Sequence, residues 1–218
     1  MDPLAPGILA RGPWTLDQVT AHWRETAYQP TAGENEAADA AIGALRERGS
    51  PAHDGFSARL VSHHEEPQRL ILELEPARWA LRLDRTDAAQ SMAAQCVVRA
   101  SDGRWLAGRR AGWLATWAGR WALGAGGAVD RGENPADTLV RELREEWSVS
   151  TSRVTAEALV CLPHRLVMLI GLAWLEEGAE VVPDAEHDAH AWWPADVDSW
   201  PPEADEVLRG TARMLARS

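Results

Sequence analysis

Residues 127–149 decide the fold and read GAVDRGENPADTLVRELREEWSV. From position 134 to 147 the apolar residues recur at helical spacing, which predicts a helix. At about 100° per residue, Glu142, Glu145 and Glu146 lie within one arc, and the apolar residues lie within an adjacent arc. We therefore expect one stripe of the helix to be buried and the neighbouring stripe to hold three carboxylates close together.

Three crowded carboxylates need a partner, because like charges three or four residues apart destabilise a helix. A hard divalent cation that takes oxygen ligands, Mg²⁺ or Mn²⁺, would neutralise them. The alternative is a solvated helix face on which Arg141 or Arg144 offsets the charge. The spacing of the residues around the cluster favours the metal.

That spacing resembles the Nudix box, Gly-x5-Glu-x7-Arg-Glu-aliphatic-x-Glu-Glu-x-Gly-aliphatic, with eight of its nine specified positions present. The upstream segments WLAGRR and GRWALGAGGAV also resemble the strand and loop before the box in that family. The resemblance covers about residues 92–215. It implies an α+β fold of the Nudix type, an α/β/α sandwich around a mixed sheet. The implied activity is Mg²⁺- or Mn²⁺-dependent hydrolysis of a nucleoside diphosphate linked to another moiety.

The resemblance also implies a role for each matching residue. The implied metal site consists of Gly127, through its backbone, with Glu142, Glu145 and Glu146. Glu133 and Arg141 would lock the loop to the helix, and we count both among the catalytic set. Metal ions held there would neutralise the pyrophosphate, lower the pKa of a bound water and align it with the phosphorus under attack.

Two features depart from the family pattern. Ser148 replaces the final glycine of the box, where a left-handed backbone often ends the helix, so we expect an altered turn. The preceding loop, GAGG at residues 124–127, lacks the proline common there. Neither departure removes a metal ligand, so they bear on the loop's shape and the substrate more than on the reaction.

The catalytic base is not fixed in this family and often comes from a loop after the later strands. Residues 184–190 hold acidic and histidine side chains in that region, and Glu186 is our first choice. The alternative is an acidic solvated loop. His164 is a weaker candidate for substrate contact, because it is placed in a loop between two strands.

Candidates for substrate binding lie just before the box. Arg109 and Arg110, at a strand end, could grip phosphate, with a surface role as the alternative. Trp113, Trp117 and Trp121 recur at every fourth residue. Trp113 and Trp117 are candidates for stacking a base or sugar, whereas core packing suits Trp121 better.

Residues 1–91 are expected to form a small N-terminal α+β lobe, and residues 92–218 the Nudix domain. The lobe would hold helices over 15–26 and 35–48, then period-two strands before and after Pro76. Its own apolar cluster should contain Leu70, Leu72, Leu74, Trp79 and Leu81. The lobe faintly resembles the leader domain of Nudix hydrolases that split UDP-sugars, which favours a nucleotide-sugar substrate.

The second domain predicts a mixed set of strands and helices. Its strands are expected at 95–100 and 104–109 around an Asp-Gly turn, and at about 154–161, 165–175 and 189–193. A Trp- and Gly-rich loop is expected between residue 111 and the box, and a final amphipathic helix at 203–216.

Composition excludes several classes of function. The formal charge of −11 disfavours nucleic acid and anionic membranes as partners. All 22 basic residues are arginine, which excludes a lysine Schiff base and a Walker-type lysine. Cys96 and Cys161 are predicted to be buried free thiols. The longest apolar run, residues 166–175, is far short of the roughly 20 residues of a membrane span, so we expect a cytoplasmic protein.

The sequence thus predicts a Mg²⁺- or Mn²⁺-dependent Nudix pyrophosphohydrolase that acts on a small-molecule diphosphate, with an NDP-sugar as one candidate. A homodimer is a further expectation. The alternatives within the enzyme class are a biosynthetic or clean-up hydrolase that acts on a prenyl diphosphate or a nucleoside triphosphate. From another class comes a Nudix-fold ligand sensor that binds without cleaving.

Overall fold

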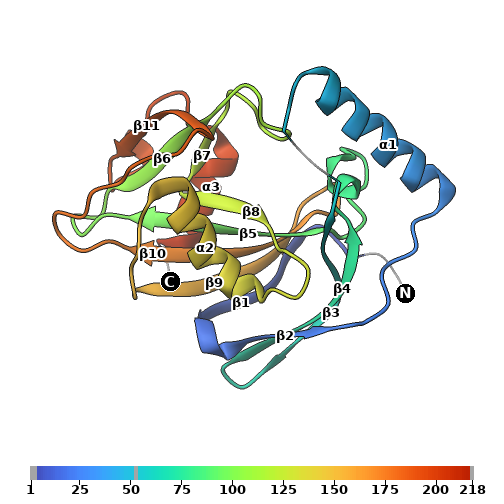
Figure 1. Cartoon of the computed structure of the whole chain (residues 1–218). Coiled ribbons are helices and arrows are strands. Elements are labelled where there is room, and N and C mark those ends of the chain that lie inside the picture. The colour runs from blue at the N-terminus through green and yellow to red at the C-terminus, as the bar shows by residue number, and fades with distance from the viewer. Residues whose placement is uncertain (1–3, 52–53, 217–218) are drawn as a thin grey trace.

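The computed structural model describes residues 4–51 and 54–216, so the outermost residues of both predicted domains, 1–3 and 217–218, lie outside it. Its main feature is an eight-stranded mixed sheet (Figure 1). The strands are β1 (Gly7–Thr15), β5 (Met92–Arg99), β6 (Trp105–Arg110), β7 (Trp121–Leu123), β8 (Ala125–Ala128), β9 (Val154–Cys161), β10 (Val167–Trp174) and β11 (His187–Trp193). Their order is β1-β9-β10-β5-β6-β11, and β7 and β8 pair with β6 and β5. Among the described strands of this sheet, β5 and β10 form the one parallel pair.

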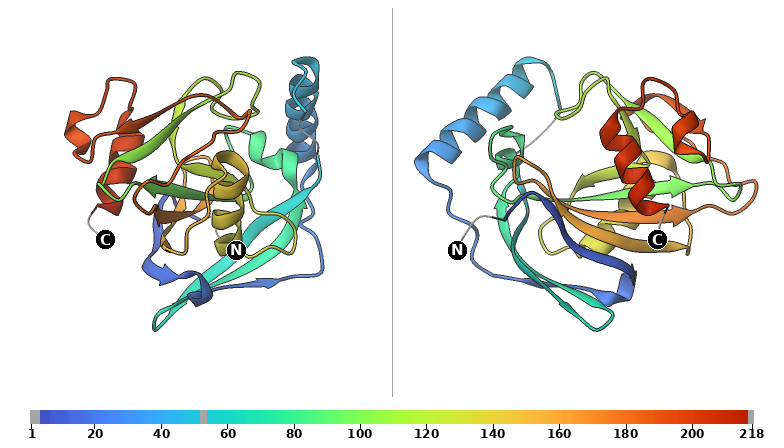
Figure 2. Two further views of the ribbon diagram at one scale, coloured as in Figure 1. Left: turned by 60° about the vertical axis from the view of Figure 1, so that its left-hand side comes forward. Right: turned by 180° about the vertical axis from the view of Figure 1, so that it is seen from behind.

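Helices α2 (Pro135–Trp147) and α3 (Glu206–Leu215) cover opposite faces of this sheet (Figures 1 and 2). Along β5, Cys96 and Val98 belong to the core that contains Leu143 of α2. Val97, on the other face, belongs to the core that contains Leu215 of α3. Successive strand residues point to opposite faces, so both faces of β5 are apolar and buried. The predicted α+β class and α/β/α sandwich with a mixed sheet are confirmed.

A second, three-stranded sheet has the order β2-β4-β3. Its strands are β2 (Val19–Trp23), β3 (Phe56–Glu66) and β4 (Arg69–Arg78). Helix α1 (Ala32–Glu47) lies between β2 and β3 in the chain. The helix predicted over 35–48 is confirmed as α1. The helix predicted over 15–26 is wrong: a short 3₁₀ helix (Leu16–Gln18) and β2 occupy that stretch. β2 pairs in parallel with β4, and this pairing outweighs local helical preference.

The end of β4 also differs from the prediction. The strand continues through Pro76 to Arg78, and a short 3₁₀ helix (Trp79–Leu83) follows where further strand was expected. β2 pairs with β4 only between Val19 and Trp23, so β4 has no β2 partner at Pro76. Proline is tolerated at such an unpaired edge because it has no N–H to donate. β7 and β8 likewise lie where a loop was expected.

The two sheets share a core. Leu70, Leu72 and Leu74 belong to one buried cluster with Met92 and Leu169 of the large sheet. The expected separate apolar cluster is therefore wrong for these leucines. The small sheet buries its apolar face by packing against the large one, and β1 joins the large sheet beside β9.

The rest of the expected cluster lies elsewhere. Leu81 packs with Ile42 of α1 in a cluster of its own, and Trp79 borders that cluster.

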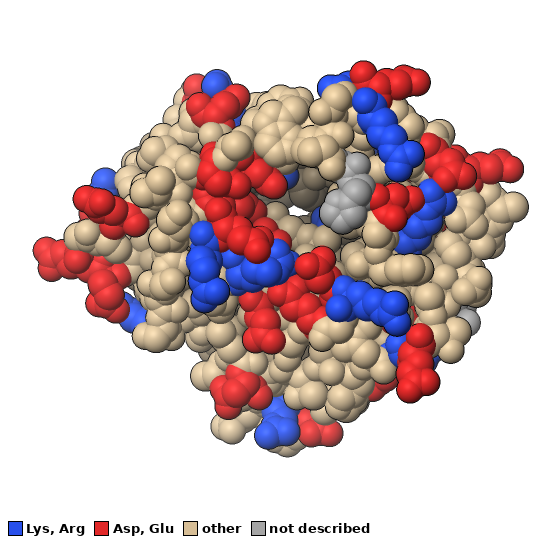
Figure 3. Space-filling model, in the orientation of Figure 1, with Lys and Arg blue, Asp and Glu red and all other residues tan. Residues whose placement is uncertain are grey.

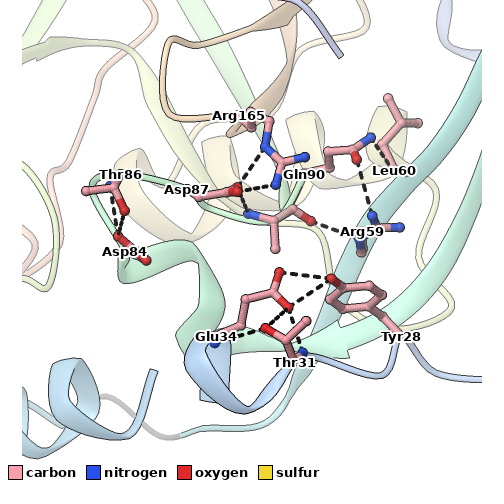
Figure 4. A network of polar contacts seen from close by, with 11 residues as sticks. Tyr28, Thr31, Glu34, Arg59, Leu60, Asp84, Thr86, Asp87, Gln90 and Arg165 are labelled. Atoms are coloured by element: carbon pink, nitrogen blue, oxygen red, sulfur yellow. Dashed lines mark hydrogen bonds and ion pairs between the residues drawn. The ribbon is translucent and has the colours of Figure 1, made fainter. Parts of the chain in front are cut away.

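A polar network joins the N-terminal part to the strands that follow it (Figure 4). Arg59 of β3 donates from Nε to the carbonyl of Ala89 at 2.9 Å and from Nη2 to Oε1 of Gln90 at 3.2 Å. Arg165, in the turn between β9 and β10, pairs with Asp87. These contacts fix the segment between the 3₁₀ helix and β5.

Two simpler predictions can be compared with the structure. Cys96 and Cys161 are free and buried, as predicted. In the part of the chain that the structure describes, every helix falls short of the length and apolar character of a membrane span.

Candidate active site

A cavity of about 1220 Å³ lies beside α2. Its walls come from β5, β7, β8, α2 and α3, from the loop after β6, and from the 3₁₀ helix Trp79–Leu83. Figure 3 shows a hollow on the face that α2 occupies in Figure 1, with acidic side chains along one rim. The N-terminal part and the Nudix-like part therefore both contribute to one cavity.

The three glutamates of α2 differ in exposure. Glu142 and Glu145 line the cavity, while Glu146 is buried, with 3% of its surface exposed. Oε1 of Glu146 accepts a hydrogen bond from the N–H of Gly126 at 2.9 Å, whereas its buried Oε2 has no hydrogen-bond partner. Burial raises the pKa of Glu146 to about 9; the Gly126 N–H opposes this, and the Glu142 charge adds to it. Burial also raises the pKa of Glu142.

Arg141 connects the loop to the helix. Its Nε and Nη2 donate to the two carboxylate oxygens of Glu133 at 2.9 and 3.1 Å. Its Nη1 donates to Glu142 and to Glu145, both at 2.8 Å. Burial alone would raise the pKa of Glu133, but the bonds from Arg141 and the Asp130 N–H outweigh it and lower that pKa. Arg141 thus joins the loop to the helix and contacts two of the three glutamates.

The donor set fits a hard divalent cation. Among residues 4–51 and 54–216, no three His, Cys, Asp or Glu side chains already converge in metal-binding geometry. Arg141 contacts Glu142 and Glu145. Oε2 of Glu146 makes no hydrogen bond to the described residues, although Nε2 of His187 lies 3.5 Å away, so this oxygen could bind a cation. At Gly127 an added Cβ would overlap the Glu142 carboxylate, so a larger residue there would displace that side chain from its present position. Carboxylate oxygens with a nearby backbone suit Mg²⁺ or Mn²⁺.

The two ends of α2 explain its position. Asn134 caps the N-terminus by accepting a hydrogen bond from the Ala136 N–H at 3.0 Å, and Pro135 begins the first turn. At the other end Ser148 has φ 54° and ψ 29°, the left-handed conformation that glycine favours. The expectation of an altered turn is therefore wrong: the serine adopts the glycine-like conformation and the helix ends as in the family pattern.

The expected catalytic base, Glu186, lines the same cavity. Its Oε2 lies 3.7 Å from Nη2 of Arg110. Burial raises the pKa of Glu186; Arg110 acts against this, and the charges of Asp184 and Glu145 add to it. The cavity therefore combines a carboxylate of raised pKa with the glutamates of α2.

The substrate-binding candidates separate into two groups. Arg110, Trp113 and Trp117 line the cavity, and the two tryptophans are 40% and 42% exposed. Arg109 is absent from the cavity lining and instead pairs with Asp188 at 2.6 Å. Adjacent strand residues point to opposite sides, which accounts for the separation.

The remaining candidates are Trp121 and His164. Trp121 lines the cavity and also packs against the core beneath α3. The sequence favoured core packing for this residue. His164 is absent from the cavity lining and lies in the turn between β9 and β10.

His187 is one of the candidates within residues 184–190 that ranked behind Glu186, and the structure places it next to Glu146. The His187 side chain is fully buried, with Nε2 3.5 Å from Oε2 of Glu146 and its ring 4.3 Å from that of Trp147. Burial and the charge of Arg110 lower the pKa of His187. Sequence reasoning missed Trp79 and Arg82 as site residues. Both line the cavity, and no spacing in the sequence pointed to them.

Comparisons with known proteins complete the description. The family model of the NUDIX domain matches residues 90–210. Among solved structures, the chain is similar to the MutT protein from Methanosarcina mazei Go1, at 20% identity and TM-score 0.45, over 58% of this chain and 93% of that one. DR0079 from Deinococcus radiodurans is 20% identical, with TM-score 0.48, over 72% and 96% of the two chains. An Ap4A hydrolase from C. elegans is 20% identical, with TM-score 0.45, over 58% and 99%.

A search of curated proteins returned no match. The family model, however, covers more than half of the chain. The protein therefore belongs to the Nudix hydrolase family.

Proposed function

We propose that this Nudix hydrolase is a divalent-metal-dependent pyrophosphohydrolase that cleaves a nucleoside diphosphate linked to another moiety. The observation that carries the proposal is the wall of α2. There Glu142 and Glu145 face a large cavity and Glu146 keeps one buried oxygen without a partner. A polyanionic diphosphate would enter such a wall only with cations between the carboxylates and the phosphates.

Glu142, Glu145 and Glu146 would hold Mg²⁺ or Mn²⁺, with the Gly127 backbone beside them. When bound, the metal would neutralise the diphosphate and lower the pKa of a bound water. Arg141 keeps the loop against the helix through Glu133, so the residues of the metal site stay close to one another.

The remaining polar residues of the cavity have separate roles in this proposal. Arg110 binds phosphate oxygens, because its guanidinium faces the cavity beside Glu186. Glu186 accepts a proton from the attacking water. Its raised pKa suits this role, since a general base works best when its pKa is near the working pH.

The aromatic wall bears on the group linked to the diphosphate. Trp113 and Trp117 expose ring surface to the cavity and can stack on a base or a sugar. We therefore place NDP-sugars first among the candidates. The same apolar rings suit a prenyl chain, which makes a prenyl diphosphate the second candidate.

A substrate panel tests the proposal. NDP-sugars, other nucleoside diphosphate derivatives, nucleoside triphosphates and prenyl diphosphates would be incubated with the protein and Mg²⁺. Released phosphate would be measured after phosphatase treatment. We expect turnover of at least one diphosphate derivative, its loss in EDTA and its return with Mg²⁺ or Mn²⁺. Full activity in EDTA would contradict the metal assignment, and tight binding without turnover would indicate a ligand sensor.

A further inference from the structure

Arg82 lines the active-site cavity without a counter-ion. It belongs to the 3₁₀ helix Trp79–Leu83 and precedes residues 90–210, which the family model matches. Among the described residues, no side chain or carbonyl pairs with or accepts a hydrogen bond from its guanidinium. The guanidinium carbon lies over the ring of Trp79, 5.9 Å from its centroid. The guanidinium is therefore open to a ligand in the cavity.

Other arginines of the cavity wall are already engaged. Arg141 pairs with Glu133, Arg120 with Asp205 and Arg213 with Asp198. Arg110 donates from Nε to the carbonyl of Thr116. Arg11 has no such partner, but it is exposed and water can solvate it. Arg82 is half-buried, so water compensates for its missing partner less well.

Keeping a cation in this position is unfavourable for the empty protein. Burial lowers the pKa of Arg82 to about 10; the negative charge of Glu142 opposes this shift, and the positive charge of Arg110 adds to it. A charge removed from water without a partner destabilises a fold. An anion from the cavity would supply the missing partner.

Arg82 lines the same cavity as Glu142, a metal-binding candidate, and Arg110, the phosphate-binding candidate. The charges of both residues also affect the pKa of Arg82. Trp79, on the same 3₁₀ helix, lines the cavity beside it. The segment before the Nudix domain thus brings a planar cationic group to the place where a diphosphate would lie.

We infer that Arg82 binds phosphate oxygens of the substrate's diphosphate, together with Arg110, and so makes the N-terminal part a component of the substrate site. The inference rests on the proposed function for the identity of the anion. A guanidinium presents paired N–H groups in one plane, which match two phosphate oxygens. Arg82 acts by binding and orienting substrate, and no proton transfer is assigned to it.

Binding of inorganic pyrophosphate tests the inference without relying on turnover. Isothermal titration calorimetry would compare the full-length wild type with Arg82→Gln, Arg82→Lys and the exposed neighbour control Arg85→Gln, in EDTA and in Mg²⁺. We expect Arg82→Gln to weaken binding at least tenfold, Arg82→Lys to recover part of the loss and Arg85→Gln to match the wild type. With the best substrate, KM should rise at least tenfold in Arg82→Gln.

Thermal unfolding without ligand separates binding from folding. Because Arg82 has no partner in the empty protein, Arg82→Gln should have the same or a higher Tm than the wild type. Unchanged pyrophosphate binding in a folded Arg82→Gln protein would overturn the inference. A lowered Tm with no recovery of binding by Arg82→Lys would also overturn it, as would a wild type that binds no pyrophosphate in either buffer. Binding that depends on Arg82 in a protein that hydrolyses nothing on the panel would support the inference and refute the proposed function.

Discussion

At the scale of single residues, the site depends on how Arg141 distributes its hydrogen bonds. One guanidinium holds Glu133 through two bonds and reaches Glu142 and Glu145 with its third nitrogen. A metal bound to the glutamates would take over part of this neutralisation and leave the bond to Glu133 in place. Glu133 therefore stabilises the fold through its bonds to Arg141 whether or not metal is bound.

Replacing Glu133 by glutamine should make stability less dependent on pH. The pKa of Glu133 in the folded protein is below its ordinary value of 4.5, so its contribution is present above that pH and is lost as the pH falls through the folded pKa. Hydrogen bonds to charged groups are worth about 1.5–3 kcal/mol, so Glu133→Gln should lower the unfolding free energy by about 2 kcal/mol at pH 7. The difference from wild type should shrink below about pH 4.

Urea unfolding at pH 7 and in acid measures this difference. Glu203→Gln, at an exposed position, is the control and should follow the wild type at every pH. An equal deficit for Glu133→Gln at both pH values would contradict the role of the ion pair.

At the scale of elements, α2 and its flanking turns position the site. Asn134 caps the N-terminus of the helix, and Ser148 ends the helix with a left-handed backbone. Both ends are therefore determined by residues next to the helix in the chain. These limits bring Glu146 against Gly126 and Glu142 against Gly127. A change at the end of α2 therefore affects stability without touching a site residue.

Ser148→Gly should stabilise the protein. The left-handed conformation costs an L-residue about 1–2 kcal/mol, and glycine avoids that cost while losing part of the gain to its more flexible unfolded state. We expect a net increase of about 0.5–1 kcal/mol in the unfolding free energy, with turnover unchanged. Ser150→Gly, which lacks a left-handed backbone, should instead be neutral or slightly destabilising. A lower stability of Ser148→Gly than of wild type would contradict this account of the turn.

At the scale of the whole molecule, two sheets share one core and one cavity. α2 and most strands after residue 92 were predictable because their apolar periodicity is local. β1 and β2 were not predictable, because each gains its stability by pairing with a strand more than 45 residues away in the chain. The glutamates and Glu186 follow from the box and its family, whereas Arg82 and Trp79 reach the cavity only through tertiary packing.

The shared core predicts one cooperative unfolding transition. Leu72 is fully buried in the small sheet within the cluster that includes Met92 and Leu169. Leu72→Ala should lower the unfolding free energy by about 3 kcal/mol. Far-UV circular dichroism and tryptophan fluorescence should move together to the new midpoint. Two separate transitions, with only one shifted, would show that the sheets unfold independently.

The central claim is that the carboxylates of α2 serve a metal-dependent hydrolysis, and Glu146→Gln tests it most directly. The change keeps the side chain's size but removes an anionic oxygen donor, so turnover on the best substrate should fall about 10³-fold or more. Stability without metal should change little, because burial raises the pKa of Glu146 to about 9 and the metal-free carboxyl is already neutral at pH 7. Glu177→Gln, at an exposed position outside the box, should keep wild-type turnover. Equal turnover for Glu146→Gln and Glu177→Gln would contradict the account and make the cluster a solvated helix face.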